Sequence, residues 1–169
     1  MGYNFCPFAH QPFKHNLIRY AVSGARDETA FIADLTHELL LLRDADKRSI
    51  ETSLVIAPYC FGDFSRYNQF LDFADVLLAQ YQLVGLIQVA SFHPAYQFAD
   101  LSADDVRNYT NRSPYPMLHL IREESVEQAR LSHSHIEAIP DANMARLQKI
   151  GLSTMAAHLK NIVHPRHGR

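Results

Sequence analysis

The chain has 169 residues, of which 47% are hydrophobic and 20% are charged, and its formal net charge is -2 at pH 7. This composition is typical of a globular protein with a sizeable core, and we expect residues 1–169 to form a single domain. The near-neutral charge excludes a broad basic surface for nucleic acid, and two cysteines are too few for a disulfide framework.

Neither end of the chain has the pattern of a targeting or membrane segment. The N-terminus lacks the basic start and the apolar run of a signal peptide, and no stretch approaches the ~20 apolar residues that cross a bilayer. The basic end HPRHGR is typical of a solvated terminus, so residues 161–169 are expected to form a flexible tail. We therefore expect a cytoplasmic protein with no nucleic-acid partner and no membrane partner.

The first third of the chain predicts a strand, a helix and a second strand. Residues 17–23 alternate and are rich in β-forming side chains, which predicts a strand. Residues 25–44 carry apolar side chains at helical spacing, with Asp27 or Thr29 as the N-cap. Residues 53–58 are a short apolar run, as found in strands that are buried on both faces.

The rest of the chain continues the alternation of helices and strands. The predicted elements are a helix at 62–81, a strand at 84–92, a short helix at 101–110, a strand at 117–122, a helix at 123–132 and C-terminal helices at 142–151 and 153–163. Strands separated by helices are typical of parallel crossovers. The sequence therefore predicts an α/β layered sandwich with a mainly parallel sheet of about four strands, at 17–23, 53–58, 84–92 and 117–122, with flanking helices and a helical C-terminus. The direction of the strand at 117–122 stays open, because the short helix before it does not require a parallel crossover.

Polar side chains gather at the ends of the last two predicted strands. In open α/β sheets, ligands bind beyond the carboxyl ends of the strands. His93 ends the third predicted strand, and Arg122 and Glu123 end the fourth. The connection between these two strands carries further candidate ligand-binding residues, namely Tyr96, Asn111, Arg112 and Ser113. We expect all of these side chains to meet in one crevice.

The leading functional hypothesis is a small enzyme that acts on an anionic small molecule. Arg112 and Arg122 would bind the anion, because a guanidinium group captures carboxylate or phosphate with two hydrogen bonds. His93 or His119 would be the general acid–base, since imidazole titrates near working pH. Glu123 would orient that histidine.

These residues also have structural interpretations. His119 lies midway along a buried strand and is also consistent with a core histidine whose ring is hydrogen-bonded. Arg112 is also consistent with an ion pair to a nearby carboxylate. Cys6 is a candidate nucleophile if the N-terminal segment crosses the crevice, and it is also consistent with an inert buried thiol.

Two other functions remain open at this stage. A metal-dependent enzyme would hold zinc or iron with His93, His119 and either Glu123 or Cys6. A non-catalytic binding or regulatory module would bind a metabolite without changing it. The density of titratable groups at the strand ends favours an enzyme over such a module. The sequence does not determine the oligomeric state.

Four sequence segments together resemble a known family. They are CPF at 6–8, RY at 19–20, SFHPAYQF at 91–98 and NYTNRSPYPMLHLIREESVEQA at 108–129. The chain is similar over almost its whole length to a bacterial family with plastid relatives, catalogued as domain-of-unknown-function family 1415. The resemblance implies a compact single domain of about this length and assigns no catalytic role. It highlights the candidate residues above and adds Pro7 and Phe8.

Overall fold

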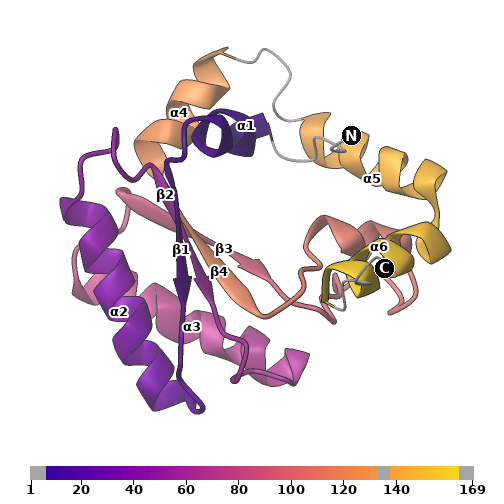
Figure 1. The fold of residues 1–169 in the computed structure, drawn as a ribbon, viewed down its shortest axis with the longest axis horizontal. Coiled ribbons are helices and arrows are strands. Elements are labelled where there is room, and N and C mark those ends of the chain that lie inside the picture. The colour runs from indigo at the N-terminus through magenta and orange to yellow at the C-terminus, as the bar shows by residue number, and fades with distance from the viewer. Residues whose placement is uncertain (1–6, 133–137, 164–169) are drawn as a thin grey trace, which may run out of the picture.

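The computed structural model describes residues 7–132 and 138–163. Its elements are α1 (Pro7–Lys14), β1 (Ile18–Val22), α2 (Glu28–Asp44), β2 (Thr52–Ile56), α3 (Phe64–Gln80), β3 (Ile87–Phe92), the 3-10 helix η1 (Val106–Thr110), β4 (Met117–Arg122), α4 (Glu123–Ser132), α5 (Ile139–Ile150) and α6 (Leu152–Val163). The strands form the centre of the molecule (Figure 1). Helices α2 and α3 lie on one side, and α5 and α6 lie on the other side, packed against η1.

The four strands form a mixed sheet in the order β1-β2-β4-β3. β1 and β2 are parallel, whereas β4 runs antiparallel to both of its neighbours. The expectation of a mainly parallel sheet is therefore wrong, although the four strands and the helical C-terminus are confirmed. The physical reason lies in the connection from β3 to β4, whose only helix among the described residues is the single five-residue turn η1. A connection without a longer helix does not carry the chain back to the opposite end of the sheet, so β4 starts at the end where β3 stops and runs antiparallel to it.

The core lies between the sheet and the helices α2 and α3. Asp27 caps α2 by accepting a hydrogen bond from the Ala30 N–H. Of the two candidate caps, Asp27 and Thr29, the structure therefore selects Asp27. The buried side chains of α2 recur at helical spacing, and those of α3 do the same. They pack on the inward-facing strand residues Val55, Leu118 and Leu120. This packing explains why α2 and α3 share one face of the sheet.

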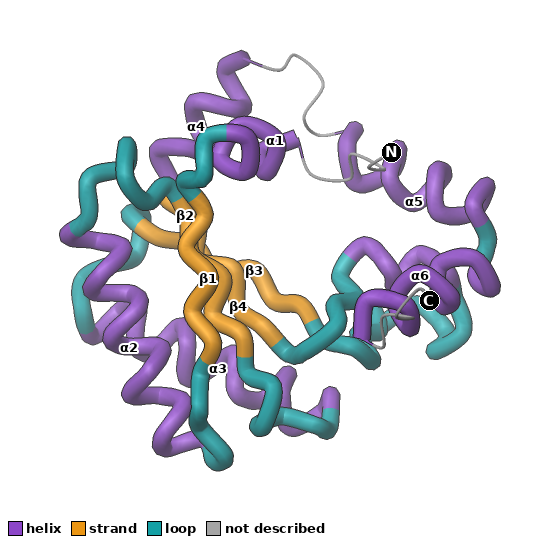
Figure 2. The backbone as a smooth tube through the Cα atoms, in the orientation of Figure 1, coloured by secondary structure: helices purple, strands orange, loops and turns teal. Residues whose placement is uncertain are grey.

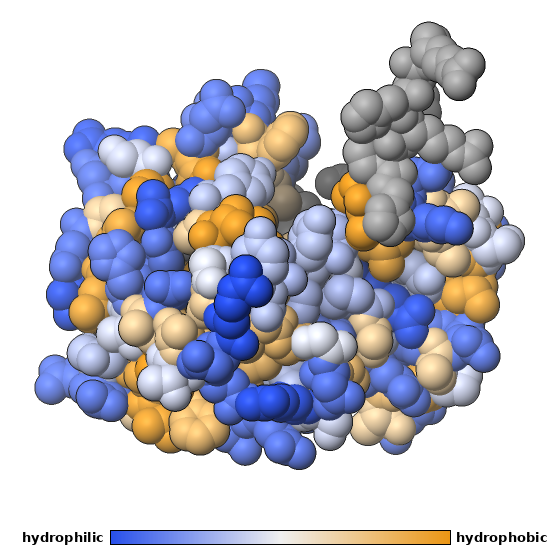
Figure 3. Space-filling model, turned by 60° about the horizontal axis from the view of Figure 1, so that its bottom comes forward, coloured by the Kyte–Doolittle hydropathy of each residue, from blue (hydrophilic) through white to orange (hydrophobic). Residues whose placement is uncertain are grey.

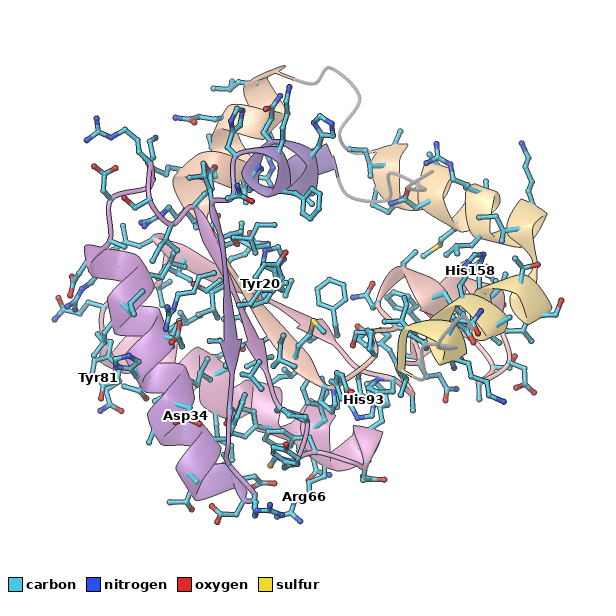
Figure 4. All side chains as sticks on the ribbon, viewed as in Figure 1. Tyr20, Asp34, Arg66, Tyr81, His93 and His158 are labelled. Carbon is cyan, nitrogen blue, oxygen red and sulfur yellow. The ribbon has the colours of Figure 1, made fainter. Side chains whose placement is uncertain are left out.

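The opposite face of the sheet is only partly covered, and we call it the open face. The strand register places the following residues on it: Ile18, Tyr20, Val22, Thr52, Leu54, Ile56, Gln88, Ala90, Phe92, Met117, His119 and Ile121. Tyr20 and Val22 are 57% and 67% exposed. Figure 4 shows Tyr20 projecting away from α2, the helix that carries Asp34. The open face is therefore mostly apolar. It is exposed at Tyr20 and Val22, half-buried at most of its other residues and buried at Thr52.

Most other element boundaries lie close to the predicted ones (Figure 2), but the short helix predicted from residue 101 begins only at Val106, as η1. β3 begins at Ile87 instead of residue 84, because Gln82 and Gly85 adopt positive φ in a turn before it. α1 was not predicted, since prolines at its first and sixth positions obscure the helical pattern. Residues 161–163 of the expected tail continue α6, and residues 164–169 lie outside the described residues.

On the face turned forward in Figure 3, hydrophobic and hydrophilic residues alternate over short distances. None of the helices in the described ranges has the length and apolar character that a membrane crossing requires.

Candidate functional site

His93 is held by the backbone on both sides of its ring. Its Nε2 lies 2.8 Å from the carbonyl oxygen of Phe61, and its Nδ1 accepts a hydrogen bond from the Ala95 N–H at 3.0 Å. The side chain is 1% exposed, and burial lowers its pKa. These partners fix the neutral tautomer with the proton on Nε2. Because both nitrogens are occupied, this geometry is that of a structural histidine.

The asparagines of the β3–β4 connection bind backbone groups of the same connection. Asn108 is fully buried: its side-chain oxygen accepts from the Phe98 N–H, and its side-chain nitrogen donates to the Ser102 carbonyl at 2.8 Å. Asn111 donates to the Ser91 carbonyl, and its own carbonyl accepts from the His93 N–H. A long irregular segment has many backbone groups without a ladder partner, and these amides satisfy them.

Arg112, Ser113 and Tyr96 belong to the same network. Arg112 donates from Nε to the Tyr96 carbonyl and from Nη2 to the Ala103 carbonyl at 2.7 Å, and its guanidinium lies 4.8 Å from the centre of the Tyr109 ring. The Ser113 hydroxyl donates to the carbonyl of Tyr115, 2.6 Å away. Arg112 therefore has a structural role in this geometry. Its partners are backbone carbonyls, and not the carboxylates that the sequence suggested.

Arg122 and Glu123 lie at the other end of the sheet from His93. β4 is antiparallel, so Met117 pairs with Phe92 while Arg122 pairs with Ile87. The expectation that the ends of β3 and β4 lie together, with His93 beside Arg122 and Glu123 in one crevice, is wrong. Arg122 instead donates from Nη2 to the carbonyls of Ala45 and Ile50, and thereby fastens the α2–β2 connection to the sheet.

His119 is the candidate whose ring is only partly engaged. It lies at the middle of β4 on the open face, where its Nε2 is 2.7 Å from the Thr52 hydroxyl. That hydroxyl donates its own proton to the Leu120 carbonyl at 2.6 Å. Thr52 must therefore accept from His119, which places the imidazole proton on Nε2. Nδ1 is left as an acceptor with no hydrogen-bond partner among the described residues.

The surroundings of His119 keep the ring neutral. Desolvation lowers its pKa to about 4 from the usual 6.5. Its cross-strand neighbours on the open face are Leu54 and Ala90, and the Phe92 ring lies 6.5 Å away between centroids. A neutral imidazole of fixed tautomer can accept a hydrogen bond, or a proton, at one defined atom.

The metal hypothesis finds little support in these positions. His93 has both nitrogens bonded to the backbone, so a ring nitrogen would have to give up a bond to bind a metal. Within residues 7–132 and 138–163, no three histidine, cysteine or acidic side chains are close enough together to hold an ion. Cys6, the other proposed ligand and nucleophile, lies outside the described residues, so its role stays a prediction.

Thr52 is the residue that sequence reasoning missed. It begins β2, 67 residues before His119, and only the antiparallel pairing of β2 with β4 brings the two side chains together. A single threonine in an apolar run carries no local signal of this contact. The Tyr67 hydroxyl was missed for the same reason: it accepts from the Phe92 N–H and donates to the Met117 carbonyl at the end of the sheet.

Comparison with known proteins identifies a family to which no function is assigned. No curated protein matches the chain. No solved structure matches it either. A family model described as "protein of unknown function (DUF1415)" matches residues 1–157, which is nearly the whole chain and includes all four segments of the resemblance. The protein therefore belongs to this family.

Proposed function

We propose that the protein binds a small, mostly apolar molecule on the open face, with His119 Nδ1 accepting a hydrogen bond from it. The observation that carries this proposal is the chain of bonds from His119 to Thr52 to the Leu120 carbonyl, which orients the ring and leaves one acceptor unpaired. An oriented acceptor within a largely apolar surface is the usual composition of a small-molecule site.

The chemistry of the ligand follows from the residues around His119. Leu54, Ile56, Met117 and Phe92 are half-buried apolar side chains on the same face of the sheet. Their burial by a ligand would stabilise the complex by about 25 cal/mol per Å² of apolar surface. The unpaired acceptor favours a ligand with one O–H or N–H donor, since an unmatched polar group would otherwise be desolvated without a partner.

The geometry of His119 supports binding of a ligand better than catalysis. A base with a pKa of about 4 accepts protons weakly at neutral pH, so binding is better supported than proton abstraction. Arg112 and Arg122 both donate hydrogen bonds to backbone carbonyls, which leaves fewer of their donors for an anion. Binding of an anionic ligand by these residues therefore stays a prediction. A cytoplasmic location belongs to the same proposal, because the chain has only two cysteines.

The test compares phenol with toluene, which has a similar shape and no donor. Protein labelled with ¹⁵N at histidine is titrated with each compound, and the Nδ1 resonance of His119 is followed by NMR. We expect phenol, and not toluene, to shift this resonance. In His119→Leu, phenol should bind about 3-fold to 10-fold more weakly, as expected for the loss of one hydrogen bond, while toluene binding is unchanged.

The matched control is His10→Leu, which alters an exposed histidine on α1. Phenol affinity should equal that of the wild type in this variant. Equal phenol affinity in His119→Leu would refute the proposal. Inorganic phosphate in the same titration tests the anion hypothesis: binding that is lost in Arg112→Gln would support it against ours.

A further inference from the structure

The outer edge of β1 has no neighbouring strand in the described part of the chain. β1 is the first strand in the sheet order and pairs only with β2. At its two ends, the Leu17 carbonyl accepts from the Glu51 N–H, and the Ser23 N–H donates to the Ile56 carbonyl. Bonded residues alternate in parallel pairing, so the backbone N–H and C=O groups of Tyr20 and Val22 face outward.

The edge of β1 carries little protection against pairing with another strand: the strand is short, and its one inward-pointing charge is neutralised by Glu38. Natural edge strands carry outward lysine side chains, prolines or bulges that prevent another chain from pairing with them. β1 has the sequence IRYAV, with no proline and no lysine, and its single charged residue, Arg19, is turned toward α2 and bonded to Glu38 at 2.7 and 2.8 Å. Tyr20 and Val22 meanwhile stay exposed.

A cavity of about 330 Å³ lies beside this edge, between β1 and α2. Its polar lining comprises Arg19, Ser23, Asp34, His37 and Glu38. Asp34 lies on α2 (Figure 4), and its carboxylate faces the end of β1, where it accepts a hydrogen bond from the Ser23 hydroxyl. A cavity of this size accommodates a long side chain that enters from a strand laid along the edge.

The charges of the cavity favour a cationic side chain. Arg19 and Glu38 neutralise each other as a bidentate pair, which leaves the carboxylate of Asp34. One oxygen of that carboxylate accepts from the Ser23 hydroxyl, and the other has no partner among the described residues. A lysine or arginine side chain would supply the missing donor and the missing positive charge.

We propose that an extended peptide segment of a partner protein adds to β1 as a fifth strand and places a lysine or arginine side chain in the cavity beside Asp34. Main-chain hydrogen bonds to Tyr20 and Val22 supply affinity, and the cavity supplies selectivity. The open face on the other side of the sheet is not needed for this contact, so the proposal stands apart from the function of His119.

The probe is an end-blocked, fluorescein-labelled heptapeptide of alternating threonine and lysine, and its binding is followed by fluorescence anisotropy. Two further versions carry backbone N-methyl groups, one on the threonines and one on the lysines. In an added strand only one of these sets donates to β1, so we expect one pattern to weaken binding at least about 10-fold and the other to be tolerated. Equal effects of the two patterns would overturn strand addition.

The variant Asp34→Asn tests the cavity, because it removes the charge and keeps an oxygen for Ser23. We expect the lysine peptide to bind at least about 3-fold more weakly, and a glutamate version to bind poorly to both proteins. Asp75→Asn on the exposed side of α3 changes the net charge equally and should have no effect. Equal losses in the two variants would overturn the cavity assignment.

A second copy of the chain is the competing occupant of the edge. Light scattering after size exclusion measures the mass of the wild-type protein and of Val22→Lys, which places a charge on the edge strand. A monomeric wild type keeps the edge free for the peptide, as we expect. A dimer that dissociates in Val22→Lys would overturn the proposal and assign the edge to self-association.

Discussion

At the scale of single residues, the same residue types serve two different purposes in this chain. His93 directly follows β3, and His119 lies on the neighbouring strand β4; the sequence offered either of them as the general acid–base. The first has both ring nitrogens bonded to backbone groups, whereas the second has one nitrogen bonded to Thr52 and one unpaired. Hydrogen-bond partners, and not residue type or burial alone, therefore distinguish the functional candidate from the structural one.

The low pKa of His119 predicts a pH dependence of stability. The folded protein binds this proton more weakly than the unfolded chain, so the stability from the neutral ring is fully present above about pH 6.5 and is lost as the pH falls toward 4. The full difference is about 3 kcal/mol for the two pKa values. Urea unfolding of wild type and His119→Gln between pH 4 and 7.5 measures it.

The variant should show a shallower decrease in the free energy of unfolding across this range. Some decrease will remain, because burial lowers the pKa of His93 in the same direction. The carboxylates of Asp46 and Asp105, whose pKa values are lowered from 3.8 to about 2, lose their contribution mainly below pH 4. Identical pH slopes in wild type and His119→Gln would contradict the prediction.

At the scale of elements, the β3–β4 connection is held together by its own side chains. Asn108, Asn111, Arg112 and Ser113 bind backbone carbonyls or N–H groups within residues 91–115. The density of polar residues in this stretch, which suggested a reaction, has a structural explanation: a long segment without a strand partner must satisfy its backbone by other means.

Tyr67, on α3, bridges β3 and β4 with its hydroxyl group at the end of their pairing. Its hydroxyl lies 3.1 Å from the Phe92 nitrogen and 2.8 Å from the Met117 oxygen, and burial raises the pKa of the phenol, which keeps it protonated and able to donate. Tyr67→Phe should lower the free energy of unfolding by about 1–3 kcal/mol, because both backbone groups lose a buried partner. Denaturant titration measures this loss.

Tyr59→Phe is the control for this prediction, since Tyr59 is exposed in the loop between β2 and α3. It should change stability by less than about 0.5 kcal/mol. If the two variants were equally stable, the bridge to Phe92 and Met117 would make no net contribution to the fold.

At the scale of the whole molecule, the two faces of the sheet have different roles. One face packs on α2 and α3 and contains the core, while the other is mostly apolar and only partly covered. A partly covered apolar sheet face contributes less to stability than a fully covered one, because part of its apolar surface stays in water until something binds. The core therefore lies on one side of the four strands, and the surface that we propose for the small molecule lies on the other.

Adjacent residues of β4 provide a direct test of this separation. Leu120 faces the core and is fully buried, whereas Ile121 faces the open side and is half-buried. Leu120→Ala should cost about 2–5 kcal/mol of unfolding free energy, the usual cost of a buried cavity. Ile121→Ala should cost distinctly less, and equal costs measured by urea unfolding would show that the open face is covered in solution.

The sequence by itself determined the class of the fold, its four strands and the family, and it narrowed the cap of α2 to Asp27 or Thr29, because these depend on local periodicity, local hydrogen bonds and segment identity. Only the tertiary structure decided the direction of β4, and with it the separation of Arg122 from His93. It also decided the pairing of Thr52 with His119 and the unpaired edge of β1 beside Asp34. Strand order and direction depend on contacts between distant segments, and residue spacing along the chain carries no record of them.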